Sequence, residues 1–306
     1  MQHPFSRPLN ERPLIEAFLK VVLNDSRYKD YTFVGKIRSC ELELANDDST
    51  SPTRDSEKNR VPGYRSDFDR FNLRKKIVDE LFKENMPDDD DEIKLGTGGA
   101  CPTSPIKKER KAFFLIGPPA SGKSAVARKV AEENGAIILD SDFAKRKLPE
   151  FDTNAGGATL VHSESSAMIW GMPSWPEDFL PLVRHCTNND INIVAPRIGN
   201  DIKDIIDMAK TFRDVYDYEV HLTLVSLDRK NATVRALNRF EKTGRYIPLS
   251  LVFDVYANDP ILTYYRLKEN HKTLFHSFGK ISTDVNLGKP PIVIHCDSTN
   301  PAELYQ

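Results

Sequence analysis

Apolar and polar positions alternate in two ways along residues 111–306, as short apolar runs and as longer segments with a helical period. The short runs are typical of buried strands, and the longer segments are typical of amphipathic helices. The predicted strands are Phe113–Ile116, Ala136–Leu139, Ile191–Ala195, Val220–Leu227 and Ile292–His295. The predicted helices between them are Ser124–Asn134, Pro176–Cys186, Lys203–Phe212 and Ala232–Lys242. Such alternation predicts an α/β protein with three layers and a mostly parallel sheet.

The pattern before residue 111 is different, and it divides the chain into three parts. Residues 1–85 contain two helix-like segments, Leu14–Asn24 and Phe71–Glu84, so this region is expected to be mainly helical. Between them, the polar and charged segment Asn46–Ser56 is expected to be mobile. Residues 86–110 join an acidic run to a stretch rich in Gly, Pro and Thr, which is the composition of a linker or loop. Residues 111–306 are then the main domain.

A phosphate-binding loop pattern follows the first predicted strand directly and precedes the first helix of that domain. Glycines allow the backbone N–H groups to turn toward a polyphosphate, and the positive end of the following helix points to the same place. The pattern G-x-x-x-x-G-K-[ST] is complete in Gly117, Pro118, Pro119, Ala120, Ser121, Gly122, Lys123 and Ser124. Lys123 supplies a cation for the phosphates and Ser124 a hydroxyl ligand for Mg²⁺. The sequence therefore predicts a bound nucleoside triphosphate such as ATP.

Carboxylates follow the second predicted strand, at the sheet edge where ligands of α/β proteins gather. Asp140 and Asp142 could lie beside a transferred phosphoryl group, where a carboxylate holds magnesium or accepts a proton from a hydroxyl. Helix capping is an equally good interpretation of one Asp, but two exceed what one cap needs. Glu164, in a polar stretch before an apolar one, could bind a substrate hydroxyl or sit in the first turn of a helix.

Three arginines form a further candidate group. Arg235 and Arg239 lie four residues apart on a predicted helix, and Gly244 is expected to end that helix and place Arg245 on a loop. This distribution suits a clamp around phosphates, although a solvated basic helix end is the simpler interpretation when the phosphate loop is ignored.

Charge and composition narrow the classes of partner. Lys and Arg number 43 against 45 Asp and Glu, which gives a net charge of -2, so neither nucleic acid nor an anionic membrane is an expected partner. No apolar run reaches the about 18 residues that span a bilayer, and the first residues lack the apolar stretch of a secretory signal. A cytoplasmic location is expected, and any export would use a route without such a signal. The four cysteines predict neither a disulfide framework nor zinc.

Taken in order, these stretches resemble the zeta toxin kinases of bacterial toxin–antitoxin systems, over about the last two thirds of the chain. The matching stretches are Gly117–Ser124, Asp140–Phe143, Leu148–Asp152, His162–Ser166, Asn192–Ala195 and Arg239–Pro248. The resemblance implies that Lys123 and Ser124 bind ATP and magnesium, and that Asp142 is the base that activates a substrate hydroxyl. It also implies that Glu164 helps to hold the substrate, that Arg239 and Arg245 contact the phosphates during transfer, and that a separately encoded antitoxin or chaperone is a partner.

The chain departs from the family pattern after the third predicted strand. Zeta toxins that phosphorylate UDP-N-acetylglucosamine usually carry an acidic residue, Gly and Thr there, whereas this chain has Pro196-Arg197-Ile198-Gly199-Asn200. Arg197 adds a charge that suits a pyrophosphate. The loop and the added N-terminal region resemble a branch represented by a plant-pathogen type III effector, a kinase acting on the adenosine 3′ hydroxyl of NAD.

Four hypotheses therefore remain at the level of sequence. The chain is expected to phosphorylate NAD, with a UDP-N-acetylglucosamine 3′-kinase as the alternative. A P-loop NTPase switch is a third possibility, against which stands the lack of a separate apolar strand ending in Asp for magnesium. A host-binding protein with the kinase fold as a scaffold is the fourth.

Overall fold

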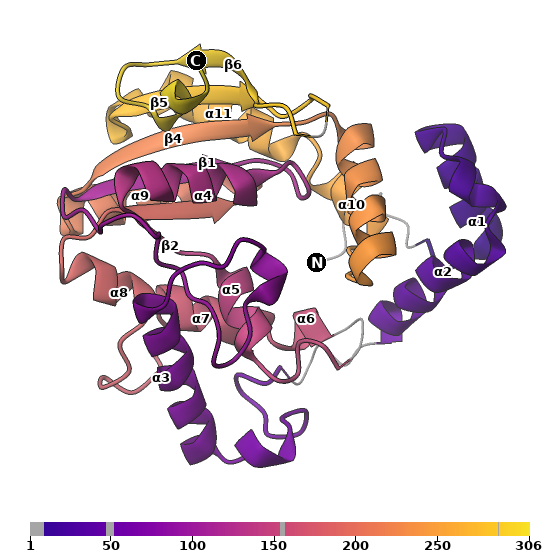
Figure 1. The fold of residues 1–306 in the computed structure, drawn as a ribbon, viewed down its shortest axis with the longest axis horizontal. Coiled ribbons are helices and arrows are strands. Elements are labelled where there is room, and N and C mark those ends of the chain that lie inside the picture. The colour runs from indigo at the N-terminus through magenta and orange to yellow at the C-terminus, as the bar shows by residue number, and fades with distance from the viewer. Residues whose placement is uncertain (1–8, 47–51, 154–156, 287) are drawn as a thin grey trace. The chain divides into compact units, whose positions relative to one another are not determined.

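The computed structural model describes residues 9–46, 52–153, 157–286 and 288–306. Its strands lie in the order β2-β3-β1-β4-β5-β6 (Figure 1). The pairs β2/β3 and β4/β5 are parallel, and β5/β6 is antiparallel. The expected three-layer α/β fold with a mostly parallel sheet is confirmed. The strand bounds are β1 Lys111–Ile116, β2 Ile137–Ile138, β3 Ile193–Arg197, β4 Glu219–Ser226, β5 Ser277–Ser282 and β6 Ile292–Cys296.

The helices of the described residues comprise α-helices and shorter π and 3₁₀ turns. The α-helices are α1 Arg12–Ala17, α2 Tyr31–Asn46, α3 Asp67–Lys83, α4 Lys123–Asn134, α5 Ser141–Lys147, α6 Gly157–Leu160, α7 His162–Trp170, α8 Leu182–Thr187, α9 Ile202–Lys210, α10 Arg229–Thr243 and α11 Asp259–Asn270. The π-helices are η1 Phe18–Leu23, η5 Thr211–Val215 and η6 Leu251–Val255. The 3₁₀ turns are η2 Ser26–Lys29, η3 Pro62–Tyr64, η4 Asp90–Glu92, η7 Lys272–Leu274 and η8 Pro301–Tyr305.

Strand β5 was not predicted, because its sequence Ser-Phe-Gly-Lys-Ile-Ser lacks an apolar run. Phe278 and Ile281 are nevertheless buried, at 1% and 0% exposure. Gly279 is required by packing, since a Cβ there would lie 2.0 Å from the side-chain oxygen of Asn300. The predicted strand at Ile292 is present, but as the antiparallel edge β6. Its partial exposure is consistent with an edge position.

The predicted helix Pro176–Cys186 begins too early, since the observed helix α8 is Leu182–Thr187. Helix α8 begins at Leu182, with Pro181 as its extended N-cap residue. The residue before a proline is biased away from helical backbone angles, which explains why residues 176–181 do not continue the helix. Helices α2 and α11 were not predicted at all. The start of α2 contains Thr, Phe, Val and Gly, which are weak helix formers, so its helicity depends on tertiary packing.

The chain divides into two compact units, and this division separates residues that the sequence grouped together. The first unit comprises residues 1–46, 113–126 and 197–306, and the second comprises 47–112 and 127–196. Of the described residues before position 86, those at 9–46 belong to the first unit and those at 52–85 to the second.

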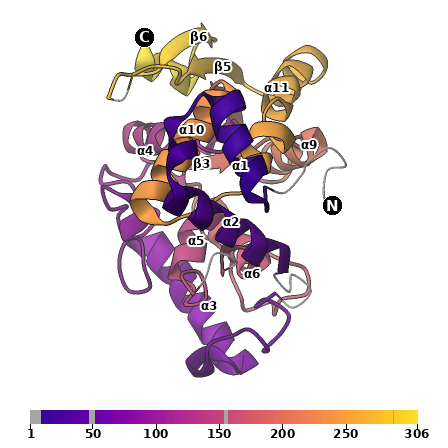
Figure 2. The same ribbon diagram turned by 90° about the vertical axis from the view of Figure 1, so that its right-hand side faces the viewer.

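In the first unit, the N-terminal helices pack against α10, and Figure 2 shows α1 and α2 beside that helix. The contact is an apolar cluster with contributions from α1, η1, α2, α10 and the loop after α10. Its buried members are Ile15, Leu19, Leu23, Phe33, Val34, Ile37, Leu237, Phe240 and Leu249.

In the second unit, the segment 86–110 is a packed loop rather than a flexible linker. Met86, Ile93 and Cys101 are buried, and Arg128 of α4 pairs with Asp90 at 2.6 Å. The segment expected to be mobile lies in part at residues 47–51, outside the described residues. At its other end, Thr53 is fully buried, so this end is fixed by packing.

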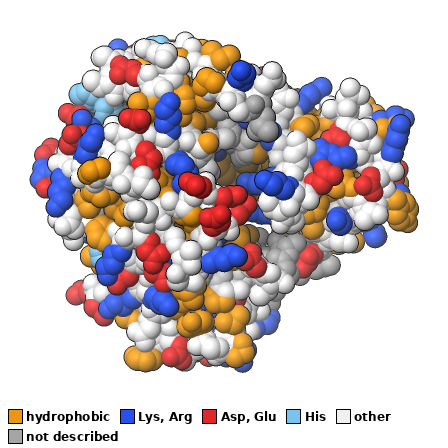
Figure 3. Space-filling view, viewed as in Figure 1, with side chains coloured by type: hydrophobic (Ala, Val, Ile, Leu, Met, Phe, Trp, Pro, Cys, Tyr) orange, Lys and Arg blue, Asp and Glu red, His pale blue; other side chains and the backbone are white. Residues whose placement is uncertain are grey.

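Surface charge agrees with the near-neutral composition. On the face shown in Figure 3, Lys and Arg side chains are interspersed with Asp and Glu. Of the helices that the structure describes, none is long and apolar enough to cross a bilayer.

Candidate functional site

The phosphate-binding loop lies in the first unit, after five buried residues of β1. Gly117 closes against β4, where a Cβ would lie 2.3 Å from the carbonyl oxygen of Val225. Ala120 and Gly122 both have positive φ angles, 59° and 81°. A left-handed conformation is uncommon for a residue other than glycine, so the backbone at Ala120 is held in a strained conformation by its surroundings. The turn into α4 that the sequence predicts is therefore present.

Lys123 is folded back over this loop. Its Nζ donates to the carbonyl oxygens of Gly117 and Pro118, both at 2.7 Å. The ammonium group therefore lies at the mouth of the loop, within reach of a phosphate that displaces one of these carbonyl contacts. Ser124 is exposed in the first turn of α4, where a hydroxyl can reach a magnesium ion on bound phosphates.

Thr283, just after β5, joins the loop to the arginine-bearing helix. Its Oγ1 donates to the carbonyl oxygen of Ser121 at 2.7 Å, and its own carbonyl accepts from Arg235 NH2 at 2.6 Å. Arg235 also donates to the carbonyl oxygen of Val285 at 3.3 Å. The predicted phosphate loop and Arg235 are thus brought together, through a residue that the sequence did not single out. Thr283 follows the strand that lacked an apolar run, so no sequence signal marked it.

Helix α10 carries two of the three arginines of the predicted clamp, Arg235 and Arg239. Asp228 caps its start by accepting from Lys230 N and Asn231 N. Gly244 ends it with a φ of 73°, as expected, and its N–H donates to the carbonyl oxygen of Phe240. Arg239 is partly buried on this helix, and Arg245 follows on the loop.

The loop after β3 borders the same phosphate loop. Gly117 N donates to the carbonyl oxygen of Ile198 at 3.1 Å, and Gly199 packs against Ile116, where a Cβ would lie 2.8 Å from the Ile116 Cβ. Arg197 at the end of β3 donates to Asp204 at 2.6 Å and retains 28% side-chain exposure. The stretch that departs from the zeta pattern is therefore next to the loop.

In the second unit, Asp140 and Asp142 begin helix α5. Asp140 is the N-cap of α5, and its side chain accepts from Asp142 N at 2.8 Å. The helix-capping interpretation is therefore correct for this residue. Burial raises the pKa of Asp140 to about 6, and the charge of Asp142 adds to the shift. Asp142 pairs with Lys145 at 2.8 Å and keeps 38% of its side chain exposed. Asp142 is thus the more accessible carboxylate for chemistry.

Glu164 lies at the centre of a buried charge cluster in the second unit. Arg70 donates to both of its oxygens at 2.7 Å, and Arg74 and Thr53 donate to one oxygen each, at 2.6 and 2.5 Å. Burial alone would raise the pKa of Glu164, but the arginines outweigh it and lower the pKa to about 2. A direct contact with a substrate hydroxyl would require one of these partners to move.

Arg70 also donates to both oxygens of Glu150, at 2.9 and 3.1 Å. Arg70 and Arg74 belong to helix α3, which the sequence predicted from its apolar face alone. Charged residues in that helix gave no signal of burial, because charged side chains are seldom fully buried.

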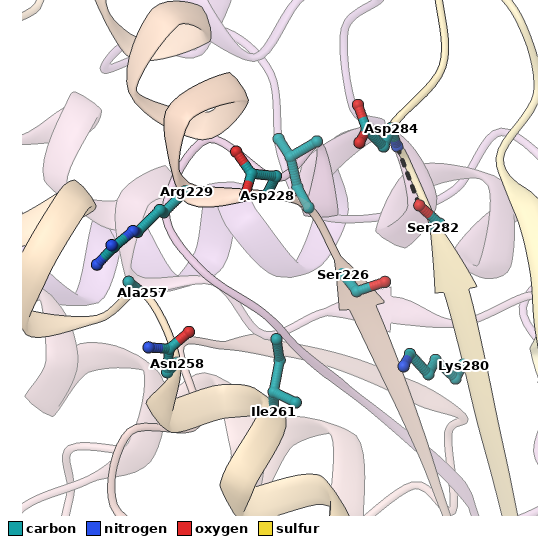
Figure 4. A pocket seen from close by; sticks show the side chains of 10 residues that line it. Ser226, Asp228, Arg229, Ala257, Asn258, Ile261, Lys280, Ser282 and Asp284 are labelled. Atoms are coloured by element: carbon teal, nitrogen blue, oxygen red, sulfur yellow. Dashed lines mark hydrogen bonds between the residues drawn. The ribbon is translucent and has the colours of Figure 1, made fainter. Parts of the chain in front are cut away.

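A pocket of about 430 Å³ lies at the ends of β4 and β5 in the first unit (Figure 4). Asp228 and Arg229 line it from the start of α10, Lys280 lines it from β5, and Ser282 and Asp284 line it beside Thr283. Its lining of hydroxyl, acidic and basic groups suits a polar ligand.

Among the described residues there is no group of three or more His, Cys, Asp or Glu side chains that could hold a metal ion. A magnesium ion that is held by substrate phosphates and one or two protein oxygens needs no such cluster.

Comparison with known proteins agrees with this geometry. The sequence model described as "Zeta toxin" matches residues 99–260. No curated protein matches the chain significantly. Among solved structures, a chain of the PezAT chromosomal toxin–antitoxin system of Streptococcus pneumoniae is 15% identical, with a TM-score of 0.50, covering 66% of this chain and 79% of its own.

Two further similar structures are complexes of AvrRxo1-ORF1 and AvrRxo1-ORF2. The native complex is 18% identical with a TM-score of 0.45, covering 82% of this chain and 73% of that chain. The complex with ATP is 16% identical with a TM-score of 0.42, covering 88% and 75%. At 15% identity, the likeness to the PezAT chain concerns the fold. The family match spans more than half of this sequence, so the chain belongs to the zeta toxin family and is a phosphotransferase that acts on a hydroxyl group.

Proposed function

We propose that this chain transfers the γ-phosphoryl group of ATP to the adenosine 3′ hydroxyl of NAD. The observation that carries the proposal is the position of the loop after β3. It borders the phosphate loop through the bond from Gly117 N to the Ile198 carbonyl, and it contains Arg197 where zeta toxins usually carry a sugar-reading Thr. An arginine beside a phosphate loop suits an acceptor that has its own pyrophosphate.

The donor side of the proposal uses residues of the first unit. Backbone N–H groups of Gly117–Ser124 and the Lys123 ammonium hold the β and γ phosphates, and Ser124 provides a magnesium ligand. Magnesium, when bound, neutralises charge on these phosphates. The pocket lined by Ser282 and Asp284 accommodates the nucleoside of ATP. Thr283, which lies between these two residues, donates to the phosphate loop, so the pocket is next to the site of the phosphates.

The transfer step is an in-line displacement. The bond between the γ phosphorus and the bridging oxygen of ATP breaks, a new bond forms to the ribose oxygen, and the hydroxyl proton passes to the Asp142 carboxylate. Arg239 and Arg245 stabilise the charge on the migrating group, with Arg235 beside the loop. Asp140 orients Asp142, because it caps the start of helix α5. Glu164 acts on the acceptor indirectly, through the side chains that surround it.

The alternative acceptor is UDP-N-acetylglucosamine. Membership of the zeta toxin family supports this acceptor, because zeta toxins include kinases of that sugar nucleotide. A separately encoded antitoxin is proposed as a partner, because the PezAT system to which this chain is similar pairs a toxin with an antitoxin.

The test is an incubation of the purified chain with ATP, Mg²⁺ and either NAD or UDP-N-acetylglucosamine, followed by mass spectrometry of the products. We expect NAD that carries one added phosphate, with the matched variant Lys108→Ala unchanged, since Lys108 is an exposed lysine outside the loop. Phosphorylation of the sugar nucleotide alone would overturn the choice of acceptor, and phosphorylation of neither would overturn the proposal.

A further inference from the structure

The loop that carries Arg245 is held from both sides by groups of the first unit. On the helix side, Thr243 Oγ1 accepts from Arg245 N at 3.2 Å and donates to the Arg239 carbonyl at 2.8 Å. On the other side, the ring of Tyr246 packs edge-on against Phe240, with 5.0 Å between centroids. Position 245 therefore lies between two fixed neighbours.

A buried carboxylate of the N-terminal helix α2 completes this support. Glu41 is 4% exposed and accepts from the Tyr246 hydroxyl at 2.5 Å. Burial raises the pKa of Glu41, and the backbone N–H of Leu249, at the far end of the same loop, opposes this shift. Burial raises the pKa of Tyr246 well above its usual 10, so the phenol keeps its proton and acts as the donor. Glu41 thus binds this loop at Tyr246 and acts on the backbone of Leu249 at its far end.

Glu41 is itself placed by the apolar packing of its helix. Phe33, Val34 and Ile37 of α2 are buried in the cluster that includes Leu237 and Phe240 of α10. An ion pair from Arg27 to Glu241 at 3.0 Å lies on the exposed side of the contact. The N-terminal helices therefore contact both the helix that carries Arg239 and the loop that carries Arg245.

We propose that Glu41 and Tyr246 are positioning residues that hold Arg245 in its place for phosphoryl transfer. This inference rests on the proposed function, in which Arg245 contacts the migrating phosphoryl group. Glu41 is 4% exposed and binds the Tyr246 hydroxyl, so both residues act through the loop. A misplaced cationic group stabilises the transition state less well, which lowers kcat more than it weakens ground-state binding.

The test compares Tyr246→Phe, Glu41→Gln and Glu41→Ala with the control Glu43→Ala, which removes an exposed carboxylate two residues along the same helix. Tyr246→Phe is the mildest change, because it removes one hydroxyl and keeps the ring against Phe240. We expect kcat to fall about tenfold in Tyr246→Phe and Glu41→Ala, with KM for ATP nearly unchanged. Glu41→Gln, which still accepts from the phenol, should retain most activity.

A double-mutant cycle separates positioning from a general loss of structure. If Tyr246 acts through Arg245, Tyr246→Phe has less than about a twofold effect on kcat in an Arg245→Ala background. An equal fall in both backgrounds would overturn the proposal. Hydrogen exchange at residues 244–249 provides a second readout that does not depend on activity, and we expect faster exchange in Tyr246→Phe.

Unchanged exchange in Tyr246→Phe would also overturn the proposal, since the loop would then not depend on the bond. A failure of the proposed function is distinguished from these outcomes by the unmodified chain, which would then transfer phosphate to neither acceptor.

Discussion

Arg70 and Glu164 form a doubly hydrogen-bonded ion pair in which both side chains are 0% exposed. The arginine is also bound to Glu150, so one guanidinium bridges two carboxylates inside the second unit, and Arg74 supplies a second positive charge. A buried pair contributes less to stability than its geometry suggests, but removal of one partner leaves an uncompensated charge in a low-dielectric interior.

Arg70→Ala is therefore expected to lower the free energy of unfolding by about 3–5 kcal/mol, measured by urea denaturation. The control Arg110→Ala breaks the exposed pair with Asp190, whose side chains are 44% and 48% exposed, and should cost less than about 1 kcal/mol. Similar losses in the two variants would contradict the assignment of a buried charge cluster.

The same cluster predicts a specific sensitivity to acid. The pKa of Glu164 is lowered to about 2 in the folded protein from its usual 4.5, so its stabilising contribution is present above pH 4.5 and is lost as the pH falls toward 2. The free energy of unfolding should fall less steeply over this range in Glu164→Gln than in the unmodified chain, although the variant starts from a lower stability. Parallel pH profiles would show that another group causes the acid sensitivity.

Lys123→Ala is expected to weaken ATP binding and to remove most of the turnover, because the ammonium group is the cation of the phosphate loop. Calorimetric titration with a nonhydrolysable ATP analogue measures the first effect, and product formation measures the second. The loop itself should remain folded, since Lys123 makes two bonds to carbonyl groups that water can replace. ATP affinity equal to that of Lys108→Ala would rule out this role.

Asp142→Asn is expected to leave ATP binding nearly intact and to lower turnover by about 10²–10⁴-fold, because placement survives and proton acceptance does not. Asp140→Asn is the matched variant, since Asn also caps helices well and removes a carboxylate two residues away. A larger loss in Asp140→Asn than in Asp142→Asn would transfer the role of base, or of magnesium ligand, to Asp140.

Much of the sheet and of the phosphate loop could be predicted, because local patterns determine them. The run before Gly117 and the two glycines of the loop specify a strand, a turn and a helix in direct succession, and Gly244 marks the end of α10. Strand β5 and Thr283 could not be predicted, because their burial comes from packing against distant residues such as Asn300.

The N-terminal region shows the same limit more clearly. The apolar face of α3 was visible in the sequence, but the burial of Arg70 depends on Glu150 and Glu164, more than seventy residues away. Likewise, Glu41 appears as an ordinary surface residue until Tyr246 is placed beside it. Pairs of buried charged or polar groups have no periodic signature, so only the folded structure reveals them.

Transfer of phosphate to a small-molecule hydroxyl is the central claim, and γ-labelled ATP tests it most directly. The measurement follows label in phosphorylated NAD and in free phosphate, with Mg²⁺, in the unmodified chain and in Lys123→Ala. We predict that most of the label reaches NAD in the unmodified chain and that almost none leaves ATP in the variant. Label that appears as free phosphate at the same rate with and without NAD would contradict the claim and identify a nucleotide hydrolase instead.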